Sequence, residues 1–304
     1  MTAITLSLMT GFVWNLVGII FGGADRKPQR LFCFFFEYSV VFIVFAAISD
    51  TILGNLEFAV STNGLKELRL LAVLVLPIGC LSMLNFYSLK RAMETGSQSV
   101  AWGIAQFSCV VPLVASIIFL GVSPSSRNII GIILMIFSLA FFSWSMAKKV
   151  SAENKGKINF TFFRFALLSF CGTGIGQTLY MLPGNPIFNL SAEILKLRVL
   201  LLALPGLLWI VPVFLSYANA EDFRAVWKRA LLYGLVVAIG QILFFRAIDA
   251  MNEIGKIGFA APLAIGSCVL LFFLYRIVSK KEKATPLVYC GMFIGIIGIL
   301  LMAR

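Results

Sequence analysis

The chain has no histidine among its 304 residues, and charged residues of all kinds make up only 12% of it. Histidine is the commonest metal ligand and the usual base that activates a nucleophile, so both roles lack their usual side chain. The cysteines stand singly within apolar runs, and their spacing predicts neither a disulfide framework nor a metal site. We therefore expect no enzyme activity and no cofactor, and any proton chemistry has to use carboxylates. The six cysteines are Cys33, Cys80, Cys109, Cys171, Cys268 and Cys290.

The sequence also lacks the polar residues that would cover the surface of a water-soluble domain of this length. Hydrophobic residues make up 60% of it, and apolar runs of about 20 residues recur from end to end. Such runs have the length of membrane-spanning helices rather than the short alternation of a membrane β-barrel. The composition predicts an all-α polytopic membrane protein.

The net charge of +12 does not indicate a nucleic-acid partner, because Lys and Arg cluster in the short segments between apolar runs. In that position they orient the chain and contact anionic lipid. Most of them follow the odd-numbered runs, which predicts a multi-pass protein of the plasma (inner) membrane with both termini on the non-cytoplasmic side. The first apolar run, 4–22, is long and is expected to remain as a helix rather than to be cleaved.

Two stretches of the chain echo each other at a separation of 155 residues. Glu67-Leu68-Arg69 precedes one apolar run and Asp222-Phe223-Arg224 precedes the other, and Arg91 and Arg246 follow them at the same separation. We count ten spans, five on each side of a basic segment at 148–159, so that 1–147 and 160–304 form two five-helix repeats. An odd number of spans per repeat predicts inverted halves, as in many transporters. The ten spans are 4–23, 31–50, 69–90, 97–120, 128–147, 160–181, 187–215, 229–248, 256–278 and 285–303.

Several prolines fall in the middle of these spans, where each removes a backbone hydrogen bond. Such prolines are tolerated where protein or a water-filled cavity satisfies the freed carbonyl group. Pro112, Pro205, Pro212 and Pro262 therefore predict kinked helices around a central cavity. The run Gly172-Thr173-Gly174-Ile175-Gly176 follows no strand, so we expect close helix packing there and not a dinucleotide site.

Two carboxylates lie within apolar spans, where a charged side chain costs at least ~2.5 kcal/mol on insertion scales. Glu37 lies in the second span and Glu193 in the seventh, at a separation of 156 residues. Each is a candidate for coupling to a proton, and Glu37 could also couple a cation or form a hydrogen bond to a polar substrate. The alternative for Glu37 is a structural acid with a basic neighbour, and for Glu193 it is an intrahelical pair with Lys196.

The fourth span carries Gln98, Trp102 and Gln106 at intervals of four residues, which places them on one face of a helix. Two amides and an indole suit the wall of a polar cavity, although a seam of hydrogen bonds between helices remains the alternative. Polar side chains on other spans extend the same prediction. The full set of expected substrate-binding residues is Trp14, Asn15, Asn85, Tyr87, Gln98, Trp102, Gln106, Gln177 and Gln241.

The architecture resembles the drug/metabolite transporter superfamily, particularly its EamA-like members. The resemblance rests on ten spans in two halves, on Pro112, Gly121 and Gly131 in the first half, and on Pro262, Gly291, Gly295 and Gly298 in the second. The basic segment 26–30 before Glu37, together with 85–89, is similar to rhamnose–proton symporters. The resemblance implies a secondary transporter that moves a small polar metabolite by alternating access with a proton as the coupling ion. The alternatives are a facilitative exporter or exchanger of amino acids, nucleosides or drugs, and a membrane receptor or assembly subunit without transport.

Overall fold

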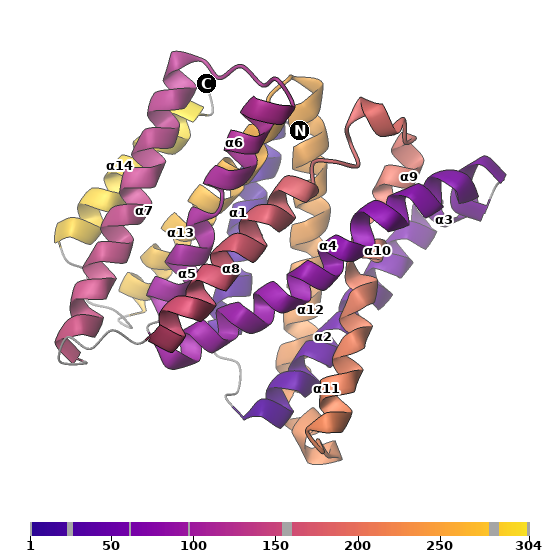
Figure 1. The fold of residues 1–304 in the computed structure, drawn as a ribbon, viewed down its shortest axis with the longest axis horizontal. Coiled ribbons are helices and arrows are strands. Elements are labelled where there is room, and N and C mark those ends of the chain that lie inside the picture. Colours follow the sequence, from indigo (N-terminus) through magenta and orange to yellow (C-terminus); the bar gives the residue numbers. More distant parts are fainter. Residues whose placement is uncertain are drawn as a thin grey trace. The chain divides into compact units, whose positions relative to one another are not determined.

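The computed structural model describes residues 2–22, 27–60, 62–96, 98–153, 160–279 and 286–302, and within these ranges the chain is helical with no strand (Figure 1). The helices are α1 (Ala3–Gly22), α2 (Pro28–Ile52), α3 (Asn55–Val60), α4 (Thr62–Thr95), α5 (Gln98–Phe107), α6 (Val110–Phe119), α7 (Ser126–Glu153), α8 (Phe160–Leu179), η1 (Pro186–Phe188), α9 (Ala192–Lys196), α10 (Arg198–Ala203), η2 (Leu204–Trp209), α11 (Ile210–Leu215), α12 (Ala220–Glu253), η3 (Ile257–Phe259), α13 (Ala260–Val278) and α14 (Pro286–Met302).

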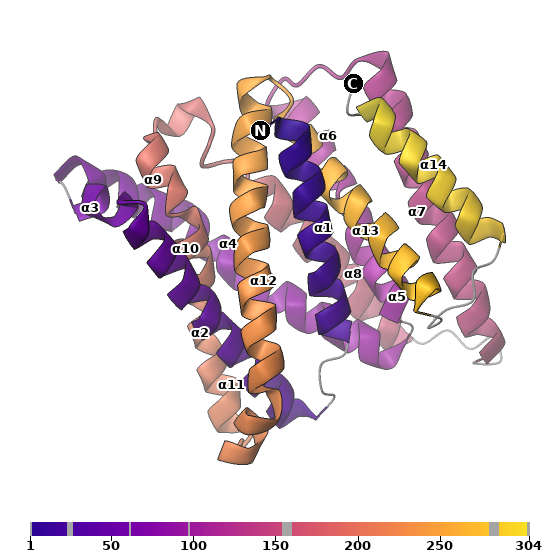
Figure 2. The same ribbon diagram turned by 180° about the vertical axis from the view of Figure 1, so that it is seen from behind.

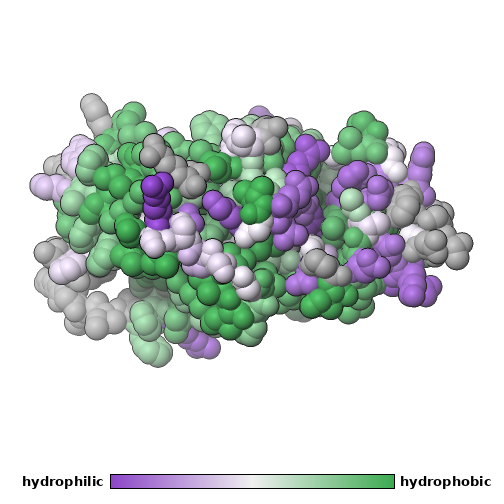
Figure 3. Space-filling view, turned by 90° about the horizontal axis from the view of Figure 1, so that it is seen from above, coloured by the Kyte–Doolittle hydropathy of each residue, from purple (hydrophilic) through white to green (hydrophobic). Residues whose placement is uncertain are grey.

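Seven segments within the described ranges are long and apolar enough to cross a membrane. Large apolar side chains such as Phe119 and Phe214 are 79% and 73% exposed, and hydrophobic residues cover much of the face in Figure 3. A polytopic helical membrane protein is thus confirmed, whereas the count of ten spans and the inverted repeat stay predictions. The seven segments are Ala3–Gly22, Pro28–Ile52, Gly64–Thr95, Ala101–Phe119, Ala192–Leu215, Ala220–Glu253 and Ile257–Tyr275, and shorter apolar helices cover Ser126–Ser138 and Tyr289–Met302.

The chain divides into two compact units, and each unit draws segments from both halves of the sequence. Unit 1 comprises Met1–Gly22, Leu84–Thr178 and Leu243–Arg304, and unit 2 comprises Gly23–Met83 and Leu179–Ile242. The first boundary follows Gly22 and the third follows Thr178, so the chain enters unit 2 at points 156 residues apart. The proposed repeats at 1–147 and 160–304 concern sequence similarity and remain a prediction.

Close helix pairs hold unit 1 together. Helix α7 runs beside α14, and α1 runs beside α13 (Figures 1 and 2). A Cβ atom on Gly131 of α7 would lie 2.8 Å from the Gly298 carbonyl oxygen of α14, so only glycine allows this approach. The Ser138 hydroxyl donates to the Gly291 carbonyl at 2.7 Å across the same pair. Small residues thus mark the packing face between α7 and α14.

Aromatic rings form the core of unit 2, where α2 packs against α10, η2 and α11. The ring centroids of Phe35 and Trp209 are 4.5 Å apart, and those of Tyr38 and Tyr233 are 4.9 Å apart. Helix α4 joins this core through Gly79, where a Cβ atom would meet the Leu202 carbonyl oxygen at 2.7 Å.

Proline interrupts two of the expected spans, as predicted. In a regular helix the Pro112 ring would clash with the backbone carbonyl of Ser108, four residues earlier. Accordingly α5 ends at Phe107 and α6 begins at Val110, and the Ser108 carbonyl accepts from the Val111 amide at 2.9 Å. Pro205 likewise lies in the 3₁₀ segment η2 between α10 and α11.

The segment 51–68 between the second and third predicted spans is helical over most of its described length. Helix α2 continues to Ile52, α3 follows at Asn55, and α4 begins at Thr62. Helix α4 also continues through Pro77 without a break.

Candidate functional site

In unit 1, α1 and α8 each come close to the segment that runs from α5 to α6, and each approach takes place at a glycine. A Cβ atom on Gly18 of α1 would lie 2.9 Å from the Trp102 ring of α5. Asn15 lies three residues before Gly18 and thus on the same side of α1. A Cβ atom on Gly174 of α8 would lie 3.4 Å from the Ser108 side chain, and Gln177 is one turn further along. The glycines therefore let α1 approach α5 closely and let α8 approach the break between α5 and α6.

Three of the predicted binding residues in this unit carry buried polar atoms that lack a hydrogen-bond partner among the described residues. They are the Asn15 Oδ1, the Trp102 Nε1 and the Gln177 Oε1 atoms. Asn15, Trp102 and Gln177 are 7%, 5% and 6% exposed. More than nine in ten buried polar groups in proteins have a partner, so three unpartnered polar atoms in one unit are unusual. Ser108, which the sequence analysis did not select, adds a buried hydroxyl of the same kind.

Two other predicted residues are engaged in contacts between helices. The Asn85 side-chain oxygen accepts from Ser169 at 2.8 Å and from Thr173 at 3.1 Å, both on α8. The Gln98 amide donates to the Gly22 carbonyl at the end of α1 at 3.0 Å. For these two side chains the geometry matches the alternative of a hydrogen-bonded seam.

The remaining predicted residues of unit 1 contact aromatic rings or are buried. The Trp14 ring lies 4.6 Å from that of Phe244, and the Tyr87 ring lies 6.4 Å from that of Phe165. Gln106 is buried on α5, eight residues after Gln98.

Unit 2 holds the predicted residues Glu37, Glu193 and Gln241. Glu37 is half-buried in α2, and its Oε2 atom is buried without a partner in the part of the chain that the structure describes. Gln241 on α12 is half-buried, and its side chain interacts with the Tyr180 hydroxyl, which also lies 3.2 Å from the Ser82 hydroxyl. Glu193 is exposed in the first turn of the five-residue helix α9, and within the described ranges it forms no ion pair with Lys196.

Two buried charged groups, Lys90 and Asp50, were not predicted from the sequence. Lys90 is 1% exposed within α4, and its Nζ lies 5.9 Å from the centroid of the Phe21 ring. Asp50 is 5% exposed in the last turn of α2 and accepts from the Asn55 amide at 3.0 Å. Each residue is the last one of its predicted span, 69–90 or 31–50, and no sequence pattern there indicates burial. Within the described residues no group of three His, Cys, Asp or Glu side chains could hold a metal ion.

Comparisons with known proteins give a likeness of fold. No family model matches the chain, and no curated protein matches it. One solved structure, described only as the crystal structure of a protein, aligns with 99% of this chain and 96% of its own, with a TM-score of 0.63 and 13% sequence identity. The fold therefore exists in a solved protein along its whole length, and this likeness carries no function.

Proposed function

We propose that the protein is a secondary active transporter that moves a small polar metabolite across the membrane by alternating access, with a proton as the coupling ion. The observation that carries this proposal is the set of buried, unpartnered polar atoms on Asn15, Trp102 and Gln177. A membrane helix bundle gains nothing from such groups, since each unsatisfied polar atom away from water costs free energy. A ligand that pairs with them removes this cost.

The chemistry of these groups limits the ligand. Amide oxygens accept hydrogen bonds, the indole Nε1 donates one, and the Ser108 hydroxyl does either. A neutral molecule with both donors and acceptors, such as a sugar, fits this set. Glu37 is the proposed coupling group, because its carboxylate lies in a membrane-spanning helix with a buried oxygen that lacks a partner among the described residues.

A second candidate is a facilitative exporter or exchanger of amino acids, nucleosides or drugs, without proton coupling. The pairing of Trp14 with Phe244 favours it, because an aromatic wall also suits a flat or apolar ligand. A receptor or assembly subunit that binds a ligand without transporting it would use the same unpartnered polar atoms.

The experiment begins with the purified protein and a thermal-shift screen over sugars, amino acids and nucleosides. A compound that raises the melting temperature is then tested for counterflow in proteoliposomes preloaded with the unlabelled compound. We expect transient accumulation of the labelled compound. Binding without counterflow identifies a receptor, and counterflow that a proton gradient does not affect identifies the facilitative alternative.

The matched variants are Trp102→Phe and Trp227→Phe. The first removes a buried indole N–H and keeps a ring, whereas Trp227 is 48% exposed on α12. The proposal requires that only Trp102→Phe weakens the thermal shift.

A further inference from the structure

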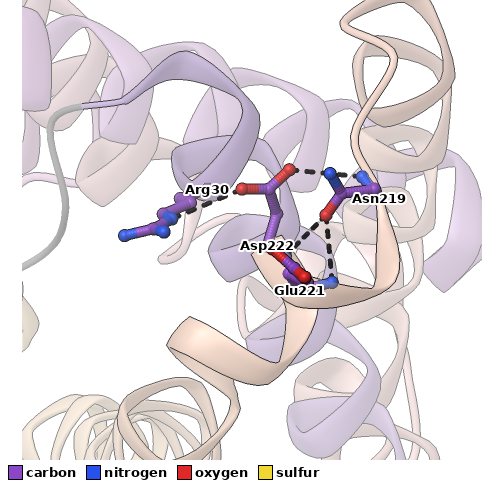
Figure 4. A network of polar contacts seen from close by, with 4 residues as sticks. All are labelled: Arg30, Asn219, Glu221 and Asp222. Carbon is purple, nitrogen blue, oxygen red and sulfur yellow. Dashed lines mark hydrogen bonds and ion pairs between the residues drawn. The ribbon is translucent and has the colours of Figure 1, made fainter.

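Two polar contacts in unit 2 each join a helix of the first sequence half to a helix of the second. At the start of α2, the Arg30 Nε donates to the Asp222 Oδ1 of α12 at 3.3 Å (Figure 4). At the start of α4, the Glu67 Oε2 accepts from both the amide and the hydroxyl of Ser191, at 2.7 and 2.6 Å. Ser191 is the N-cap residue that directly precedes α9. We call these the Arg30–Asp222 latch and the Glu67–Ser191 latch.

The carboxylates of the two latches occupy equivalent places in the sequence. Glu67 and Asp222 are the acids of the two echoing stretches, 155 residues apart, and each is followed by an apolar residue and an arginine. Each lies near the first turn of a 34-residue helix, α4 or α12. Each binds the beginning of a helix from the opposite half. The two echoing stretches therefore share the kind of contact that their acids make as well as their residue types.

The latches lie at opposite ends of α2. Arg30 is in its first turn, and at its last turn Asp50 bonds to Asn55 of α3, which packs against α9 and thus adjoins Ser191. Figure 1 shows α3 and α9 together at one end of α2 and α11 at the other. A helix of 25 residues is about 37 Å long, which exceeds the ~30 Å hydrocarbon layer. The two latches consequently face opposite sides of the membrane.

In each latch, one of the two residues can form other hydrogen bonds when the latch opens. Ser191 makes no side-chain bond to its own helix, so on leaving Glu67 its hydroxyl can cap α9, as serine does at helix starts. Asp222 also accepts from the Asn219 amide at 3.2 Å, while the Asn219 side chain accepts from the amides of Glu221 and Asp222 (Figure 4). This reciprocal cap keeps Asp222 satisfied without Arg30. Opening either latch therefore costs little free energy. A purely structural contact would not need such an alternative partner.

We propose that the two latches are the paired gates of the transport cycle: one opens on its side of the membrane while the other stays closed. This rests on the proposed function, because alternation between sides has a purpose only in a transporter. The structure holds both latches closed. The four side chains position helices and do not touch the substrate.

The test uses spin labels beside each latch, in protein whose six native cysteines are replaced by alanine. One pair is Gln29→Cys with Ala220→Cys, and the other is Lys66→Cys with Ala192→Cys. Pulsed electron resonance in ligand-free nanodiscs measures the fraction of long distances for each pair. Arg30→Gln is expected to raise that fraction at 29/220 about five-fold, the equilibrium change that corresponds to ~1 kcal/mol for a partly exposed ion pair.

The decisive readout is at the opposite latch. Arg30→Gln is expected to lower the long-distance fraction at 66/192, and Ser191→Ala is expected to lower it at 29/220. Arg224→Gln removes an exposed arginine two residues after Asp222 and is expected to change neither pair. A change in distance confined to the altered latch is local loosening, and a widening of both pairs together is general loosening. Either result overturns the proposal. Counterflow by the wild-type protein tests the proposed function separately. Counterflow without opposite distance changes at the two latches refutes only the gates. Opposite distance changes without counterflow refute only transport.

Discussion

The Asn85 side-chain oxygen lies 2.8 Å from the Ser169 hydroxyl, and it accepts a second hydrogen bond from Thr173 at 3.1 Å. One amide on α4 thus serves two hydroxyls of α8. A Cβ atom on Gly172, between them in sequence, would lie 3.2 Å from the Asn85 side chain, which shows how closely the helices meet.

Replacing this amide is expected to destabilise unit 1. Asn85→Leu removes the shared acceptor and leaves two hydroxyls without it, for a loss of about 1–2 kcal/mol. The measurement is the melting temperature of the purified protein in detergent. Thr178→Val is the control, since Thr178 donates only to the Gly174 carbonyl of its own helix, at 2.9 Å. Equal melting temperatures for Asn85→Leu and wild type would contradict a structural role for Asn85.

The contact between α7 and α14 is expected to tolerate no side chain at Gly131. Gly131→Ala places a methyl group 2.8 Å from the Gly298 carbonyl oxygen, and separation of the two backbones costs about 1–3 kcal/mol. Gly176→Ala on α8 is the matched control, because nothing lies within 4 Å of a Cβ atom there. Thermal unfolding compares the two variants. A Gly176→Ala protein that melts below Gly131→Ala would refute the packing account.

The Trp102 indole is expected to bind ligand by hydrogen bonding rather than by ring packing alone. Trp102→Phe keeps a ring in place against Phe272, whose centroid is 5.8 Å away, and removes the Nε1 donor. We expect a compound found by thermal shift to bind about 5- to 10-fold more weakly, the loss of roughly one hydrogen bond. Isothermal titration measures the dissociation constant. Unchanged affinity would exclude the Nε1 donor from the site.

Glu37 is expected to couple transport to the proton gradient. Glu37→Gln keeps the shape of the side chain and removes its ability to exchange a proton. We expect accumulation driven by a pH gradient to disappear, whereas counterflow, which needs no gradient, persists. Glu57→Gln removes an exposed carboxylate from α3 and serves as the control. Gradient-driven uptake that survives in Glu37→Gln would assign the coupling to another group.

Local patterns in the sequence predicted a large part of this fold. Long apolar runs predicted membrane-spanning helices. In hydrocarbon the backbone N–H and C=O groups can form hydrogen bonds only with each other, which a helix allows. Pro112 predicted the break between α5 and α6 because its ring excludes the carbonyl of Ser108. The glycine run 172–176 predicted close helix packing, and a Cβ atom on Gly174 would lie 2.8 Å from the Val111 side chain.

Contacts between distant segments were not predictable in the same way. Nothing near Asn85 indicates that its oxygen serves Ser169, and nothing near Ser191 indicates that its hydroxyl bonds to Glu67 rather than capping α9. The burial of Asp50 was not predicted either, although it is the last residue of the predicted span 31–50. Here the helix continues by two residues and buries the carboxylate against Asn55. Such partners depend on which helices pack together, and a single sequence does not encode that in any local pattern.

The measurement that tests transport most directly is counterflow by the purified protein in proteoliposomes, with a compound found by thermal shift and with Trp102→Phe in parallel. The account predicts transient uphill accumulation of labelled compound by the wild-type protein and a weaker apparent affinity for the variant. A wild-type protein that binds the compound but carries no label into the vesicles would contradict it.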